Sequence, residues 1–258
     1  MSSHFHAVGF PVREMRDYWR LGQRAVAAGQ RVGGADGHAL FRWAPGGGPE
    51  IWALADAAGE VVSATPFFAT DDAYRLAVTG SGVSDERGLE GWVDGWLNPS
   101  EDDEPFSGVF PMRVDVVNYA LVAPRLRQGA VVSVRLVLLL HEATLYPTEG
   151  AYAAVREREY RPPLPSVSSC AHFDVEDVAE DMEATALVVG RVVEARELVN
   201  TATDAAFWWM RLEVASGLTL PAATDREVLP VPPRVGNVLA ASGWVLGEVL
   251  PAGSPPVG

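Results

Sequence analysis

The spacing of apolar residues predicts both helix and strand in the first 160 residues of the chain. Apolar positions recur at helical spacing over residues 13–28, which predicts an amphipathic helix there. Two alternating segments, residues 38–43 and 50–54, flank a glycine-rich turn and predict a strand pair. Residues 131–141 are apolar on both alternating faces, as expected of a central strand that is covered on both sides.

Four further elements are predicted in the same region. Residues 5–12 look like a strand, and so do residues 112–117. Residues 89–97 fit a helical stripe, although each glycine in it would cost about 1 kcal/mol in a helix. Residues 149–158 predict a short helix with Thr148 as its N-cap.

The last region is a succession of strands and turns. A long extended segment covers residues 185–199, and Gly190 within it predicts a bulge or bend. Shorter strands are predicted at residues 207–215 and 218–222, and closing strands at residues 237–250.

This order of elements resembles the OB-fold, a small five-stranded barrel, over residues 184–250. The predicted fold class is therefore α+β, with a mixed α/β-sheet N-terminal domain at residues 1–160 followed by a small OB-like β-barrel. Residues 161–183 are rich in proline and acidic side chains and are predicted to be a linker. Residues 251–258 are predicted to be a flexible tail.

Composition narrows the possible functions. All 20 basic residues are arginine, so neither a Schiff-base lysine nor a P-loop lysine is available. The net charge is −14, which disfavours nucleic acid and anionic membranes as partners. The single cysteine, Cys170, excludes an intramolecular disulfide. The N-terminal segment lacks the pattern of a signal peptide, and we expect a cytoplasmic protein without a membrane segment.

The predicted strand at residues 207–215 has two different faces. Alternation places a set of core-type side chains on one face; these are Trp208, Met210, Leu212 and Val214. Phe207, Trp209 and Arg211 lie on the other face. Aromatic and arginine side chains are enriched in protein interfaces, so this face is predicted to dock against the first region or against a protein partner. Single-strand nucleic acid is the alternative occupant, although the region lacks a basic footprint.

A second candidate site lies near the N-terminus. His4 and His6 would share one face of a strand, and Glu50 on a later strand could add a carboxylate. The order of strand, helix and further strands over residues 4–68 resembles the metal-binding module of the glyoxalase-type (vicinal oxygen chelate) superfamily. That resemblance implies a divalent metal held by His4, His6 and Glu50. The alternative is that the two histidines have no metal-binding role.

The sequence contains no motif that identifies a function, and we consider three hypotheses. The favoured one is a non-catalytic intracellular binding or scaffold protein with a protein partner or self-association, and with no cofactor. The first alternative is a divalent-metal-dependent enzyme of glyoxalase-like type in the N-terminal domain. The second is single-strand nucleic-acid binding by the barrel.

Overall fold

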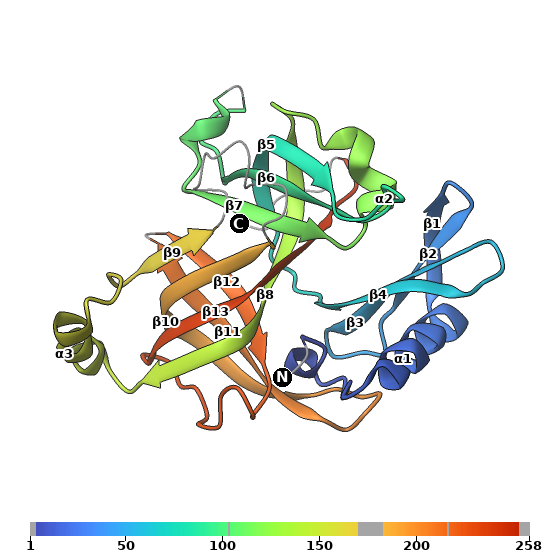
Figure 1. Cartoon of the computed structure of the whole chain (residues 1–258). Helices are drawn as coiled ribbons and strands as arrows, with labels where there is room; N and C mark the ends of the chain where they lie inside the picture. Colours follow the sequence, from blue (N-terminus) through green and yellow to red (C-terminus); the bar gives the residue numbers. More distant parts are fainter. Residues whose placement is uncertain (1–3, 103, 170–182, 216, 253–258) are drawn as a thin grey trace.

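The computed structural model describes residues 4–102, 104–169, 183–215 and 217–252. The protein is mostly β-sheet, with 49% of its residues in strands and 16% in helices, so the sheets rather than the helices define its architecture. A four-stranded sheet and a nine-stranded sheet lie side by side (Figure 1). None of the helices in the described residues is long and apolar enough to span a bilayer.

The smaller sheet is an antiparallel meander in the order β1-β2-β3-β4. Its strands are β1 (Gln30–Ala35), β2 (His38–Trp43), β3 (Pro49–Ala55) and β4 (Val61–Phe68). Helix α1 (Met15–Ala28) covers one face, where the backbone N–H of Ala64 donates to the Tyr18 hydroxyl at 2.8 Å. The predicted helix and the predicted strand pair of this region are both confirmed.

The larger sheet has the order β11-β12-β8-β5-β6-β7-β13-β10-β9. Its strands are β5 (Tyr74–Val83), β6 (Gly91–Leu97), β7 (Phe110–Val116), β8 (Val131–Tyr146), β9 (Ser166–Ser169), β10 (Thr185–Val199), β11 (Ala206–Ala215), β12 (Leu218–Thr224) and β13 (Val238–Val249). Additional pairings of β11 with β10 and of β8 with β13 close two circuits of hydrogen-bonded strands. One circuit is β8-β13-β10-β11-β12, and the other is β8-β5-β6-β7-β13.

Strands β8 and β11 each bury both faces over part of their length, at residues 136–140 and 207–210. Leu136, Leu138 and Met210 point into the cluster of apolar side chains enclosed by the large sheet, which we call the interior cluster. Leu139 and Phe207 belong to a second cluster, which also includes side chains of α1 and the four-stranded sheet. We call this second region the inter-sheet layer. The prediction that residues 131–141 form a strand is confirmed, and residues 136–140 of it are buried on both faces.

Two predicted elements are wrong. Residues 5–12 contain a short 3-10 helix, η1 (His6–Val8), that ends at Gly9 in the left-handed conformation. Residues 89–97 contain strand β6 instead of a helix, with alternating burial. Its glycines allow close approach of the neighbouring strand, because a Cβ at Gly95 would lie 2.5 Å from the carbonyl oxygen of Ala77. The glycines that weakened the helix prediction are thus what the strand requires.

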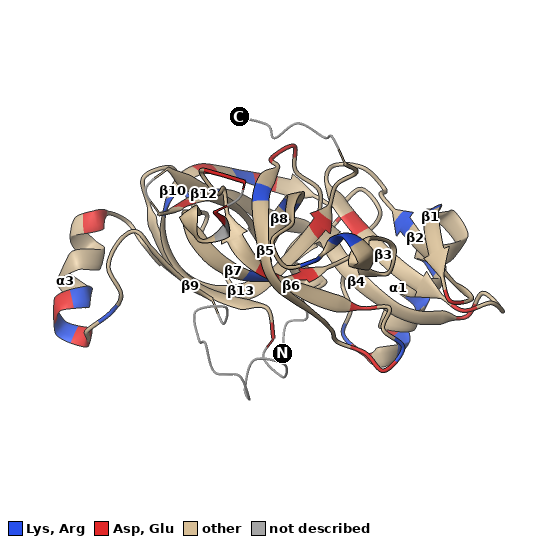
Figure 2. Cartoon of the chain, turned by 90° about the horizontal axis from the view of Figure 1, so that it is seen from above, with Lys and Arg blue, Asp and Glu red and all other residues tan. Residues whose placement is uncertain are grey.

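The connections bring distant segments together. Short helices α2 (Tyr119–Val122) and η3 (Ala123–Arg125) follow β7, and η2 (Pro105–Ser107) precedes it. Helix α3 (Glu149–Glu159) projects from the body and carries side chains of both charges (Figure 2). Its predicted N-cap is confirmed, since the Thr148 hydroxyl accepts from the Ala151 N–H at 3.1 Å.

Strand pairing crosses the predicted domain boundary. Strand β8 comes from the predicted N-terminal domain, yet it pairs with β13 over twelve residue pairs from Val238–Tyr146 to Val249–Val134. Part of the predicted linker is strand β9, which pairs with β10. Residues 170–182 of that linker, including Cys170, and residues 253–258 of the predicted tail lie outside the described residues.

Candidate ligand-binding site

A cavity of about 260 Å³ lies in the inter-sheet layer, where the four-stranded sheet faces β7 and β13. Its wall combines apolar, aromatic, hydroxyl and carboxyl side chains. The described lining residues are Leu40, Trp52, Leu54, Ser63, Thr65, Ser84, Leu89, Glu90, Gly91, Asp115, Val116, Val117, Ala120, Trp244 and Leu246. The volume is slightly below the usual range for small-molecule pockets, about 300–1,000 Å³.

The alternation of strand side chains builds the two sides of the cavity. On β4, Ser63 and Thr65 line the cavity, whereas the intervening Ala64 is buried and receives α1 on the other face. On β13, Trp244 and Leu246 line the cavity, whereas the intervening Val245 belongs to the interior cluster. Alternate side chains of strands in both sheets therefore form the cavity wall.

Asp115 is placed by pairing at the end of β7. It lies opposite Leu246 in β13, and its carboxylate accepts a 2.5 Å hydrogen bond from the Trp244 indole N–H. Burial raises the pKa of Asp115 to about 6, a shift that the Trp244 hydrogen bond and nearby Arg113 reduce and that Glu183 and Glu90 increase. Asp115 is thus a carboxyl group that changes charge in the weakly acidic range.

Glu90 enters the cavity from the turn between β5 and β6. The Asp85 carboxylate fixes this turn by accepting from the N–H groups of Leu89 at 2.8 Å and Glu90 at 3.0 Å. Burial raises the pKa of the Glu90 carboxyl group, and a hydrogen bond from Ser63 on the opposite sheet opposes the rise. The two carboxyl groups, Glu90 and Asp115, therefore come from adjacent parts of one sheet and line one cavity.

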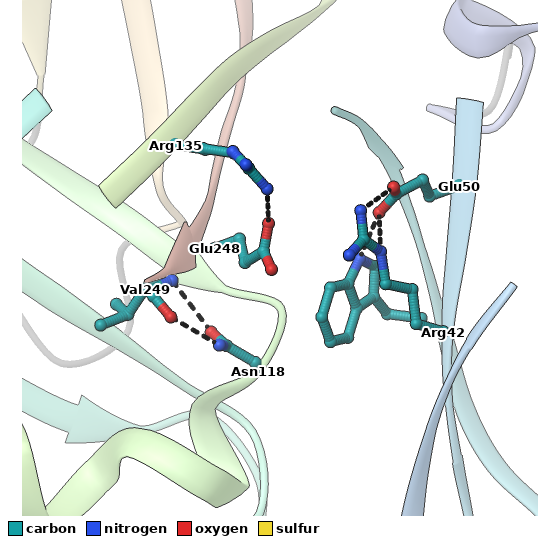
Figure 3. Close-up of polar contacts among 7 residues, drawn as sticks. Arg42, Glu50, Asn118, Arg135, Glu248 and Val249 are labelled. Atoms are coloured by element: carbon teal, nitrogen blue, oxygen red, sulfur yellow. Dashed lines mark hydrogen bonds and ion pairs between the residues drawn. The ribbon is translucent and has the colours of Figure 1, made fainter. Parts of the chain in front are cut away.

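Two ion pairs face each other across the inter-sheet layer (Figure 3). On the four-stranded sheet, Arg42 pairs with Glu50, which is 2% exposed, and the Trp52 indole N–H donates to Glu50 at 3.1 Å. On the large sheet, Arg135 donates to Glu248 at 3.1 Å. Burial raises the pKa of Glu50, while Arg42 opposes the rise and Glu248 adds to it. These contacts hold the indole of Trp52, which lines the cavity.

The three predicted metal ligands have separate partners. His4 lies 3.3 Å from His141, nitrogen to nitrogen, and its ring packs on Trp244. His6 is paired with Asp225 at 3.9 Å, while Glu50 is held by Arg42 and Trp52. Since residues 5–12 form no strand, the two histidines do not share a strand face as predicted. Among the described residues, no group of three or more His, Cys, Asp or Glu side chains could hold a metal ion.

The predicted binding face of β11 is covered by the first region of the chain. Phe207 is fully buried and Trp209 is 6% exposed, and both rings contact Phe68 of β4. Arg211 forms ion pairs with Asp72 at 2.7 Å and with Glu194 at 3.5 Å. The aromatic side chains that were candidates for base stacking or partner docking therefore lie in the inter-sheet layer.

Sequence reasoning missed the carboxyl groups of the cavity. Asp115 lies within a correctly predicted strand, and a carboxyl residue between two apolar neighbours is the signal that could have identified it. Glu90 lay in a segment predicted to be helical, which concealed its position at a turn. The chain matches no model of a known protein family, and no curated protein matches it.

Proposed function

We propose that the chain is a non-catalytic binding protein that holds a small organic ligand between its two sheets. The observation that carries this proposal is the cavity in the inter-sheet layer, with its mixed wall of indole, hydroxyl, carboxyl and aliphatic groups. An apolar pocket with a few convergent polar groups and perturbed carboxyl pKa values is the usual form of a ligand site.

We further propose that the circuit β8-β13-β10-β11-β12 is an OB-like barrel that supports this cavity. Five strands, a filled apolar interior and a glycine within long strand β10, near the register shift between Val192 and Glu194, support that assignment. A Cβ at Gly190 would lie 3.0 Å from the Glu213 carbonyl oxygen, so the glycine lets β10 pass close to β11. In this proposal the four strands that follow the predicted linker, β10 to β13, form a closed barrel only with β8, which pairs with both β12 and β13.

Rigid placement of the wall supports binding. The turn that carries Glu90 is fixed by Asp85, and the Trp244 indole is fixed by Asp115. Trp52 is fixed by Glu50. A pocket whose polar groups are held in place before the ligand arrives loses less conformational entropy on binding.

Filling the cavity tests the proposal. Ser63→Phe places a ring in the cavity from β4, and Ser84→Trp places one at its rim, where Ser84 is exposed. Ser100→Phe is the matched control, because Ser100 lies on an exposed turn away from the cavity. A library of small aromatic and aliphatic compounds is screened by ligand-observed NMR against all four proteins.

We expect compounds that bind the wild-type chain and the Ser100→Phe variant but bind neither cavity-filled variant. Circular dichroism checks that each variant is folded. Binding that survives both cavity-filling changes in folded protein would contradict the proposed site. The protein partner and the two alternative functions stay predictions.

A further inference from the structure

We propose that the ligand of this cavity is a small organic cation, an amine with an apolar body; the inference rests on the binding function proposed above. The side chains of the cavity wall define this chemistry. Two carboxyl groups, two indole rings and three hydroxyl groups line it together with aliphatic side chains. No arginine or histidine occurs among the described residues that line it.

The carboxyl groups are positioned to receive an ammonium group. Asp115 and Glu90 line the same cavity, where burial first and the charge of Glu90 in addition raise the pKa of the Asp115 carboxyl group. Each has only part of its hydrogen-bonding capacity used by the contacts with Trp244 and Ser63. A carboxylate can accept up to about four hydrogen bonds, and an ammonium group donates three. An ammonium group would thus satisfy the charge and the free acceptor sites together.

The aromatic and aliphatic groups suit the remainder of such a ligand. Trp52 belongs to the four-stranded sheet and Trp244 to the large sheet, and both line the cavity. An indole face is the preferred aromatic partner of a cation, and it also packs against an apolar ring. Leu54 and Leu246 extend the apolar wall from the same two strands, β3 and β13. The ligand would therefore be amphipathic, with its charge near β7 and its body between the sheets.

The inferred ligand couples binding to proton release. The groups that act on Asp115 are Arg113 from its own strand, Trp244 from β13, Glu90 from the β5–β6 turn, and Glu183. His4 and His141 lie beside Trp244, and burial lowers the pKa of His4. An ammonium group beside Asp115 favours the ionised carboxylate, so its binding releases the proton that the free protein holds below about pH 6. Affinity for an amine should consequently fall between pH 7.5 and pH 5.

Three probes of one shape separate charge recognition from simple filling of the cavity. They are 2-phenylethylamine, 2-phenylethanol and phenylacetate, which carry a cationic, a neutral and an anionic polar end. Calorimetry measures their binding to the full chain at pH 7.5 and pH 5. We expect the amine to bind most tightly and phenylacetate most weakly. Glu90→Gln and Asp115→Asn should each weaken amine binding about tenfold or more, since each removes a charged hydrogen-bond acceptor.

The matched control is Glu86→Gln, which makes the same change in charge on an exposed position of the same turn. It should leave amine affinity within about twofold. Equal binding of the amine and the alcohol, unchanged by Glu90→Gln and Asp115→Asn but lost in Ser63→Phe, would overturn the cationic ligand while the binding cavity stands. Tighter binding of phenylacetate would overturn it too. Absence of binding by all three probes, together with no hit in the library screen, would overturn both proposals.

Discussion

The two clusters of buried side chains differ in chemistry. The interior cluster, enclosed by the large sheet, is built from apolar side chains such as Leu136 and Met210. The inter-sheet layer contains apolar side chains as well, but it borders the buried carboxyl groups of Glu50 and Glu248 and the cavity with Asp115. Both regions are largely excluded from water, but the buried carboxyl groups of Glu50 and Glu248 and the cavity lined by Asp115 lie in or beside the second.

This difference indicates where function lies. A densely packed apolar interior stabilises a fold and leaves little room for a ligand. Buried charged groups are costly unless paired, so their concentration between the sheets calls for an explanation. The ion pairs Arg42–Glu50 and Arg135–Glu248 lie beside the cavity, and in the proposed function its carboxyl groups receive the ligand.

The largest expected effect tests whether the inter-sheet layer stabilises the fold as the interior does. Phe207→Ala removes a fully buried ring between β11 and Phe68, and should lower the free energy of unfolding by about 3–5 kcal/mol. The measurement is urea denaturation followed by circular dichroism. Val199→Ala on adjacent β10 is the control, because Val199 is 49% exposed. Equal small losses in both variants would mean that the two sheets are not joined by this contact.

The next effect concerns the buried ion pair. Arg42→Ala leaves the Glu50 carboxyl group buried without its partner and should cost about 2–4 kcal/mol at pH 7.5. The loss should be smaller at pH 5, where the unpaired carboxyl group can take up a proton. Urea denaturation at both pH values measures it. Arg31→Ala, an exposed change on β1, should stay within about 0.5 kcal/mol; a similar loss there would contradict a specific role for the pair.

Asp115 provides a smaller, pH-dependent effect. Its folded pKa of about 6 lies above its ordinary value of 3.8, so the folded state binds the proton more tightly than the unfolded state. This carboxyl group therefore destabilises the fold increasingly as pH rises from about 4 to 6. Asp115→Asn removes that cost, and relative to wild type it should gain about 2 kcal/mol between pH 4 and pH 7.5. A difference independent of pH would show that Asp115 titrates normally.

The smallest effect lies outside both clusters. Thr148→Ala removes the N-cap of the projecting helix α3 and should cost about 1 kcal/mol or less. Hydrogen exchange should show faster exchange in the first turn of α3 and no change at the cavity. Thr148→Ser keeps the capping hydroxyl and serves as the control. Altered exchange in β7 or β13 would indicate that α3 influences the cavity.

The sequence predicts elements better than their assembly. Local patterns correctly located β8 from its apolar segment, β10 from its long extended segment and β11 from its alternating faces. It also assigned the core face of β11, where Met210 and Leu212 are fully buried. The pairing of β8 with β13 joins segments about 100 residues apart and follows from tertiary contacts that local patterns do not encode.

The candidate sites were predicted less well for the same reason. His4, His6 and Glu50 were grouped by an expected strand that the structure replaces with η1. The cavity joins Ser63, Glu90, Asp115 and Trp244 from four separate parts of the chain. Only the packing of the two sheets brings these four residues together.

Indole NMR tests the binding cavity most directly. Titration of ¹⁵N-labelled protein with 2-phenylethylamine at pH 7.5 should shift the indole N–H signals of Trp52 and Trp244 together, to saturation, because both rings line the cavity. The signal of Trp208, whose indole N–H donates to the Leu229 carbonyl in the interior cluster, should not move. Saturable binding that shifts Trp208 and leaves Trp52 and Trp244 unchanged would contradict the account.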